Sequence, residues 1–333
     1  MKHFAKTAVA AALTMAFAAP AFAVAPVTVY GKINASVGSE DSLDTDGSET
    51  VVSSNASRFG IKGGVELTDS LQAVYKLEWE VNVSDQDKGN GSDDNIKSRN
   101  QYVGLKGGWG EFQIGRNDTM LKKSQGKVDL FGDLDGDIKH LFKGENRLGD
   151  SVVYMTPKFN GFYGGVSVIT EDNSKQKDED GDETTGFSLA GMYGDAKFKK
   201  SDLFASLAYD SEVAGYDILR ATAQYKWNDL KVGGMYQNQE KVEHDSEDYS
   251  GYMFSVAYKI NAITLEAQYQ MMEMSDDVDM TAMSVGAEYK LGKPTKVFAY
   301  YTLRDLDEDV LNEDSGEVMD DETFFGVGLE HKF

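Results

Sequence analysis

Apolar and polar side chains alternate with a period of two along most of this chain, which is the pattern of β-strands whose two faces meet different surroundings. In the first such segment, Val27, Val29, Ile33 and Val37 alternate with polar or small residues. The alternation returns at near-regular spacing and predicts sixteen strands. Their ranges are 27–37, 58–67, 71–81, 101–106, 111–116, 152–156, 162–170, 187–193, 203–209, 218–227, 230–237, 252–259, 263–271, 281–291, 297–304 and 324–333.

The final predicted strand shows the pattern most clearly. Phe325, Val327, Leu329 and Phe333 fall on one face, whereas Glu330 falls on the other. One apolar face and one polar face are typical of a strand that has lipid on one side and water on the other. The chain end therefore predicts a transmembrane β-barrel.

The connections between the predicted strands are sorted by length. The short ones cover 68–70, 107–110, 158–161, 228–229 and 260–262, and they take turns with long polar ones over 39–54, 84–97, 171–185, 238–248, 272–279 and 305–322. Short turns on one rim and long loops on the other are the arrangement of an antiparallel membrane barrel, with the short turns periplasmic and the long loops outside the cell. A soluble β-sandwich, the alternative for many short strands, has no reason to sort its connections in this way.

The beginning of the chain has the features of a secretory signal. Two lysines among the first six residues precede an apolar run over 7–19, and Ala-Phe-Ala at 21–23 has the small-x-small form of a cleavage site. The apolar run is too short for a transmembrane helix. The sequence therefore predicts a signal peptide over 1–23 and a single barrel domain over 24–333.

Composition excludes several other classes. The chain has no cysteine, 34 glycines, 17 tyrosines, 17 phenylalanines and only 4 prolines, which suits a sheet held by backbone hydrogen bonds without disulfides. A mean hydropathy of -0.44 is too polar for a helical membrane protein, but a barrel exposes only alternate residues to lipid. A net charge of -23 makes nucleic acid a poor partner, because binding phosphates requires clustered cations.

Four short segments and the last residue carry a resemblance to a known family. They are Val-Thr-Val-Tyr-Gly-Lys at 27–32, Ser-Arg-Phe-Gly-Ile-Lys-Gly at 57–63, Tyr-Val-Gly-Leu-Lys-Gly at 102–107, Gly-Arg-Asn-Asp-Thr at 115–119, and Phe333. Over nearly its whole mature length the chain resembles the Gram-negative general-diffusion porins, the sixteen-stranded trimeric family. The resemblance implies a homotrimer in the outer membrane that passes ions and small hydrophilic solutes without a cofactor. It also implies contact with lipopolysaccharide and outer-membrane lipid, and with the assembly machinery through Phe333.

The longest connection, residues 117–149, is implied by the same resemblance to fold into the lumen and to narrow it. Charges on this loop and on the wall opposite would then set the selectivity of the pore. The candidate residues on the wall are Lys32, Arg58, Lys62, Arg99 and Arg116, and those on the loop are Asp118, Lys122, Lys123, Asp129, Asp133 and Asp135. The Pro-Glu-Phe-Gly-Gly signature of the enteric porins is missing, and Leu-Phe-Gly-Asp at 130–133 is the nearest stretch.

Two acidic stretches resemble fragments of calcium loops, in which closely spaced carboxylates surround a hard cation. Neither has the complete EF-hand spacing. The candidate calcium ligands are Asp133, Asp135 and Asp137 in one stretch and Asp178, Asp180 and Asp182 in the other. The alternative is a hydrated acidic loop that shares divalent cations with lipopolysaccharide at the cell surface.

Three other functions compete with that of a general-diffusion channel. An outer-membrane hydrolase needs a nucleophile with a base, yet the mature chain has only His140, His244 and His331, and it lacks a Gly-x-Ser-x-Gly elbow. We therefore expect no enzymatic activity. A substrate-selective porin and a non-conducting adhesin or structural barrel stay open. The acidic external loops predict weak cation selectivity that declines as salt rises.

Overall fold

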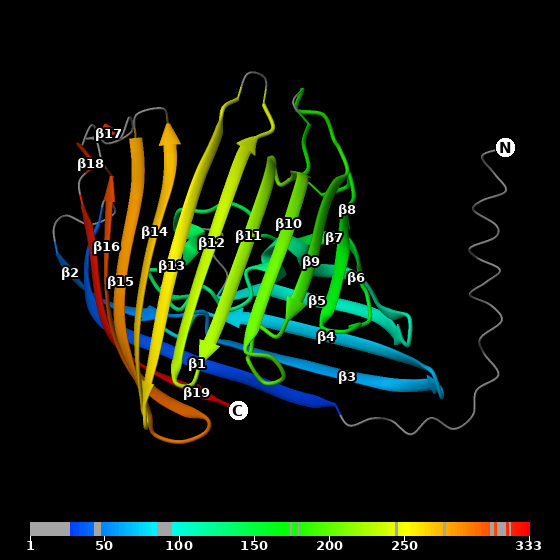
Figure 1. Ribbon diagram of the computed structural model, residues 1–333, viewed down its shortest axis with the longest axis horizontal. Helices are drawn as coiled ribbons and strands as arrows, with labels where there is room; N and C mark the ends of the chain where they lie inside the picture. Colours follow the sequence, from blue (N-terminus) through cyan, green and yellow to red (C-terminus); the bar gives the residue numbers. More distant parts are fainter. Residues whose placement is uncertain are drawn as a thin grey trace.

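The described residues form one antiparallel sheet that closes on itself. The computed structural model describes residues 27–42, 48–84, 95–173, 175–178, 180–243, 246–275, 278–306, 310–311, 318–319 and 321–333. The first strand, β1 (Thr28–Asp41), pairs with the last, β19 (Glu322–Lys332), and also with β2 (Glu49–Ser54) and β3 (Arg58–Thr68). Because β2 and β3 pair with successive halves of β1, they are two parts of one strand. The barrel therefore has the sixteen strands that the sequence predicts (Figure 1).

The other strands follow one another around the ring in chain order. They are β4 (Leu71–Val81), β5 (Ile96–Gly107), β6 (Gly110–Asp118), β7 (Arg147–Met155), β8 (Phe162–Ile169), β9 (Gly186–Gly194), β10 (Leu203–Val213), β11 (Tyr216–Trp227), β12 (Leu230–Lys241), β13 (Asp248–Ile260), β14 (Ile263–Ser275), β15 (Val278–Lys290) and β16 (Thr295–Leu306). A small ladder, β17 (Val310–Leu311) with β18 (Val318–Met319), lies between β16 and β19 in the chain. The helix α2 (Met120–Ser124) and the 3₁₀ turn η2 (Ile138–His140) both lie between β6 and β7. Among the residues with a described position, no helix is long and apolar enough to cross a membrane.

Several strands extend beyond the predicted ranges, and this corrects the predicted loops. The strand β2 occupies part of the predicted loop 39–54, and most of the predicted loop 272–279 belongs to β14 and β15. On the same rim, only Ala214 and Gly215 join β10 to β11. Strict alternation of short and long connections is therefore wrong. The backbone ladder continues past the lipid-facing zone into water, where the side chains no longer need to alternate in polarity.

The two faces of the strands differ as the sequence predicts. On β19, Phe325, Val327 and Leu329 are 46–48% exposed on the outer face, whereas Glu330 is only 5% exposed on the inner face. The inner face is polar elsewhere too. Its buried residues include Gln113, Ser151, Arg220, Thr222, Gln237, Gln268, Gln270 and Ser284.

Residues 119–146, between β6 and β7, pass through the inside of the ring (Figure 1). We call this segment the inner loop. Its apolar side chains pack on the inner wall at three places, which together form most of the buried apolar core. Met120 and Leu121 pack with Val153 and Phe204; Val128, Ile138, Leu141 and Phe142 pack with Met235, Met253 and Met272; and Phe131 packs with Phe298, Tyr300 and Phe324. The lumen is thus partly filled by the chain itself.

Candidate functional site: the narrowed lumen

A break between β2 and β3 places the first wall cation. Ala56 lies in the left-handed region, with φ of 48°, and the chain around it is held to β1. The Ser57 hydroxyl donates to the Asn34 carbonyl oxygen at 3.0 Å, and Asn55 Nδ2 donates to Ser36 Oγ at 3.0 Å. Because β3 starts directly after this break, Arg58 is the first residue of a strand and reaches toward the inner loop.

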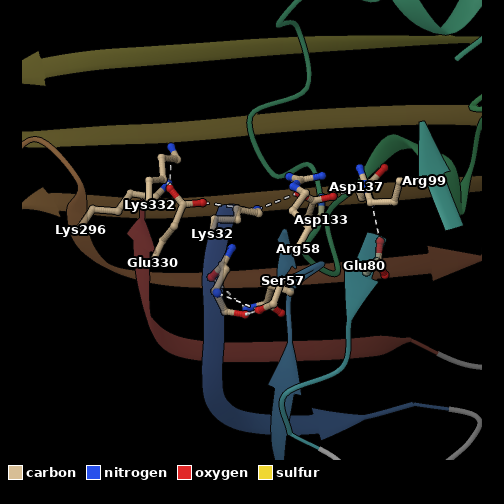
Figure 2. A network of polar contacts seen from close by, with 12 residues as sticks. Lys32, Ser57, Arg58, Glu80, Arg99, Asp133, Asp137, Lys296, Glu330 and Lys332 are labelled. Atoms are coloured by element: carbon tan, nitrogen blue, oxygen red, sulfur yellow. Dashed lines mark hydrogen bonds and ion pairs between the residues drawn. The ribbon is translucent and has the colours of Figure 1, made fainter. Parts of the chain in front are cut away.

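Asp133 of the inner loop meets two of the predicted wall cations. Its carboxylate accepts from Lys32 Nζ at 2.9 Å and from Arg58 Nη2 at 2.8 Å, and Figure 2 shows it between the two side chains. Lys32 also reaches Glu330 on β19, at 3.4 Å. Burial alone would raise the pKa of Asp133, but Arg58 and Lys32 outweigh it and lower the pKa to about 2. The carboxylate is therefore ionised at neutral pH and ties the loop to β1 and β3.

Both ends of the inner loop are held by further ion pairs. At the start, Arg147 pairs with Asp118 at 2.8 Å, and Lys123 Nζ donates to the Asp118 carbonyl oxygen at 2.6 Å. Burial lowers the pKa of Lys123 to about 8. At the other end, the fully buried Arg220 of β11 donates to Glu145 Oε1 at 2.6 Å. Arg220 is thus a fully buried cation that holds the loop.

Neutral groups also hold the middle of the inner loop. Tyr300 donates to Asp135 Oδ2 at 2.6 Å. The amide groups of Gln268 and Gln270 on β14 both donate to the Gly136 carbonyl oxygen, at 2.9 and 2.8 Å. Asp137 accepts the N–H groups of its own loop. The three carboxylates of the stretch 133–137 therefore have separate partners.

The second candidate calcium stretch forms a turn around Asp178. Its Oδ1 accepts the N–H groups of Asp180 and Asp182 at 3.1 and 2.9 Å. Within the described parts of the chain, no group of three or more potential ligands is arranged to hold a metal ion. Calcium binding at either stretch stays a prediction.

A cavity of about 420 Å³ lies between the inner loop and the wall of β3, β4, β5 and β7. Its charged lining residues are Arg58, Glu80, Arg99, Lys122, Lys127, Asp129, Asp133, Asp137, Lys139, Glu145 and Arg147. Arg99 reaches across to Glu80 within this wall, as Figure 2 shows. The predicted division into loop carboxylates and wall cations is therefore incomplete, because Glu80 belongs to the wall and three lysines belong to the loop.

Two groups of the inner loop have pKa values that are shifted toward their uncharged forms. Burial and the neighbouring Asp137 raise the pKa of Asp129 well above its ordinary range. Burial and the nearby Arg304 lower the pKa of His140 to about 4. Six cations line the cavity and outnumber its five carboxyl groups.

The structure separates the predicted site residues into two groups. Those that line the cavity are Arg58, Arg99, Lys122, Asp129 and Asp133, and Lys32 contacts it through Asp133. The others, Lys62, Arg116, Asp118, Lys123 and Asp135, are not among its lining residues. Lys62 faces inward nearer the β3–β4 turn, and its Nζ lies 5.0 Å from the centre of the Tyr30 ring.

Sequence reasoning did not single out two residues of the narrowed lumen, Glu80 and Arg220. A signal for Arg220 is present, since it shares the inward face of its predicted strand with Thr222 and Gln224. The contact of Arg220 with Glu145 could not be predicted, because it depends on how the loop folds.

Comparison with known proteins identifies the family. A family model described as Gram-negative porin matches residues 8–309. The chain belongs to the Gram-negative porin family. Among curated relatives, the major outer membrane protein P.IB of Neisseria meningitidis serogroup B is 28% identical, with 97% of this chain and 98% of that protein covered. The P.IB protein of Neisseria gonorrhoeae is 29% identical at the same coverage.

Solved porin structures share the fold. The anion-selective porin from Comamonas acidovorans aligns with a TM-score of 0.75 at 21% identity, covering 93% of this porin and 100% of that chain. An OmpF of Salmonella typhi in complex with daunomycin aligns with a TM-score of 0.72 at 15% identity, covering 92% and 97%. With the family established, this porin is a non-enzymatic channel protein of the outer membrane.

The lowered pKa of Asp133 predicts how acid affects the porin. An ionised carboxylate with a pKa of about 2 stabilises the docked loop by about 2 kcal/mol relative to an ordinary aspartate, and this contribution is lost only as pH falls from about 4 toward 2. Single-channel current noise should therefore stay low at pH 4 and rise near pH 2. In an Asp133→Asn variant, the noise should already be high at pH 7. Equal noise in both proteins at every pH would contradict this role.

Proposed function

We propose that this porin forms a water-filled channel for passive diffusion of ions and small hydrophilic solutes, with the inner loop as its narrowest part. The observation that carries the proposal is the passage of the loop through the ring beside a cavity lined by charged side chains. Ionised groups keep such a passage wet and disfavour apolar solutes. Measurable conductance in planar bilayers would support this function. An assembled barrel that conducts no current would favour the alternative of an adhesin or structural barrel.

We further propose a weak preference for cations that declines as salt rises. Carboxylates crowd the rim of the long connections, where they attract cations, but their field fades beyond about 8 Å at physiological ionic strength. Those in described positions include Glu40, Asp41, Glu49, Glu171, Asp172, Asp178, Asp180, Asp182, Glu183, Glu240, Glu243, Glu247, Asp248, Glu273 and Asp279. The small excess of cations in the narrowed lumen opposes this preference, which keeps it weak.

Replacing Arg58 tests the proposed balance of charges. In an Arg58→Ala variant the lumen loses one cation, while Lys32 still holds Asp133 at 2.9 Å, so the cation preference should increase. The measurement is the reversal potential across a potassium chloride gradient, in dilute and in concentrated salt. Lys62→Ala is the matched control, because Lys62 is an inward cation on the same strand outside the cavity. Firm anion selectivity of the unchanged porin in dilute salt would overturn the proposal.

A stronger preference for one solute class would instead indicate a substrate-selective porin. The solved porin from Comamonas acidovorans is described as anion-selective, so a porin of this fold can prefer one class of solute. Liposome swelling with neutral sugars, monovalent anions and monovalent cations of similar size separates the two. General diffusion predicts rates ordered by size, with charge as a smaller effect.

We also propose a homotrimer surrounded by lipopolysaccharide and outer-membrane lipid, exported with a signal peptide over 1–23. That segment lies outside the described residues. The proposed recognition by the assembly machinery uses Phe333, which is 57% exposed at the end of β19. Its main chain exchanges two hydrogen bonds with Gly31 of β1, at 3.0 and 3.1 Å. The aromatic end of the chain is thus presented on the outer face of the seam.

A further inference from the structure

A second cavity lies on the periplasmic side of the inner loop. Its volume is about 370 Å³, and it lies between the loop and the short-turn ends of the strands. Its polar lining residues are Lys127, Asp129, Lys197, Gln224, Lys231 and Ser255. Lys127, Asp129 and Leu130 also line the narrowed lumen, so the two cavities adjoin.

Three lysines from three separate elements converge on this second cavity. Lys127 belongs to the inner loop, Lys197 to the connection between β9 and β10, and Lys231 to the start of β12. Within the described chain, none of the three forms an ion pair within 4 Å. By contrast, the other cations of the narrowed lumen each have a carboxylate partner. Those cations are Arg58, Arg99, Lys122, Lys139 and Arg147.

The cavity offers little negative charge to balance the lysines. Asp129 is the one carboxyl among its lining residues, against three lysines, and burial together with the neighbouring Asp137 raises its pKa. Glu266 of β14 interacts with Lys231 but lies beyond ion-pair distance. Burial and the charge of Lys197 both lower the pKa of Lys127, so these two cations act on each other. A bound anion would relieve this repulsion.

The backbone at Lys127 and at Lys197 is held in place before any ligand binds. The Lys127 N–H donates to Gln224 Oε1 at 2.8 Å, which leaves the Gln224 amide group as a further donor. Asp195 accepts the N–H groups of Lys197, Lys199 and Lys200 at 3.0 to 3.1 Å. The adjacent Phe198 has a φ of 52°, a conformation that a bulky residue adopts only when its surroundings impose it. The turn that carries Lys197 is therefore an ordered structure.

We infer that this second cavity is a binding site for small divalent or trivalent oxyanions of the phosphate class, reached from the periplasmic side. Three unpaired ammonium groups, with the Gln224 amide and the Ser255 hydroxyl as additional donors, suit an anion that has several oxygen acceptors. A monovalent halide would bind this site less tightly, because it carries one charge and has no set of oxygen acceptors. The inference goes beyond passive conduction, since it assigns a saturable site next to the pore.

Inorganic phosphate is the probe for this site. Calorimetric titration of the detergent-solubilised, assembled porin should show saturable phosphate binding that chloride at equal ionic strength does not reproduce. Lys197→Ala and Lys231→Ala should each weaken the binding at least about threefold, the effect of removing one charge from a partly wet site. Lys199→Ala and Lys200→Ala are matched controls, because both lysines belong to the same turn but do not line the cavity. The two control variants should bind phosphate with the same affinity as the unchanged porin.

Conductance gives an independent measurement of the same site. Phosphate added on the side of the short turns should reduce the single-channel current at lower concentrations than phosphate added on the other side, and Lys197→Ala should abolish the difference. Loss of potassium chloride conductance would count against the proposed channel and leave the calorimetric test intact. If calorimetry showed no saturable phosphate binding, or if all four variants bound phosphate with equal affinity, the proposed anion site would be wrong.

Discussion

Removing residues 129–137 should raise the single-channel conductance several-fold while the barrel stays assembled. This segment holds the part of the inner loop that crosses the lumen, including Asp133 and the Phe131 side chain that packs on Phe298 and Tyr300. The sixteen-stranded ladder does not depend on it, because no strand residue lies within the deletion. A short glycine–serine linker would join the ends, and planar-bilayer recordings would measure the current.

The control for this deletion is one of the same length in another connection. Residues 175–183 lie between β8 and β9, and those of them that the structure describes do not line the narrowed lumen, so their removal should leave the conductance nearly unchanged. Circular dichroism and resistance to cold detergent would verify that both variants are folded. Unchanged conductance in a correctly assembled 129–137 deletion would mean that the inner loop does not limit the current.

Replacing Arg220 should loosen the second half of the inner loop. The fully buried guanidinium donates to Glu145 at 2.6 Å, to Gln237 at 2.7 Å and to the Lys143 carbonyl oxygen at 3.0 Å. An Arg220→Met variant leaves the Glu145 carboxylate without its main partner, at a cost of about 3 kcal/mol for breaking a buried pair. Single-channel noise should rise sharply, and trypsin should cleave the loop after Lys139 or Lys143.

Two further variants separate the charge of Arg220 from its packing. Adding Glu145→Gln to Arg220→Met removes the uncompensated carboxylate, so the single-channel noise should fall most of the way back to that of the unchanged porin. A double-mutant cycle would measure this coupling. Lys122→Met removes a weaker partner of Glu145, at 3.8 Å, and should have a smaller effect. If the Arg220→Met variant had the same current noise and the same protease resistance as the unchanged porin, the proposal that Arg220 holds the inner loop would be wrong.

The alternation of apolar and polar residues with a period of two predicts most of the barrel. Each predicted strand range overlaps a strand of the structure, because lipid outside and water inside impose the same alternation on every strand. The ends of the strands follow less reliably from the sequence. At β14 and β15 the ladder continues through Glu273 and Asp279, which lie opposite each other beyond the apolar zone. Backbone pairing persists there although the side-chain signal has stopped.

The narrowed lumen could be predicted only in part, and for a physical reason. Arg58 and Asp133 could be proposed because one lies on an inward strand face and the other in the longest loop. Their contact could not, since it depends on the break at Ala56 and on the docking of Phe131. The exclusion of Arg116 has a similar origin, because the pairing of β6 with β7 shifts register between Gly115 and Asn117. Such irregularities leave no periodic trace in the sequence.

The seam between β1 and β19 has a consequence for biogenesis. The strand made first pairs along ten residues with the strand made last, and Phe333 completes that pairing at Gly31. A nascent or truncated chain without its final strand has two unpaired edges, which favour association with other chains. Closure therefore requires that β19 has been made, so the exported chain has to be kept from pairing with other chains until that strand is present.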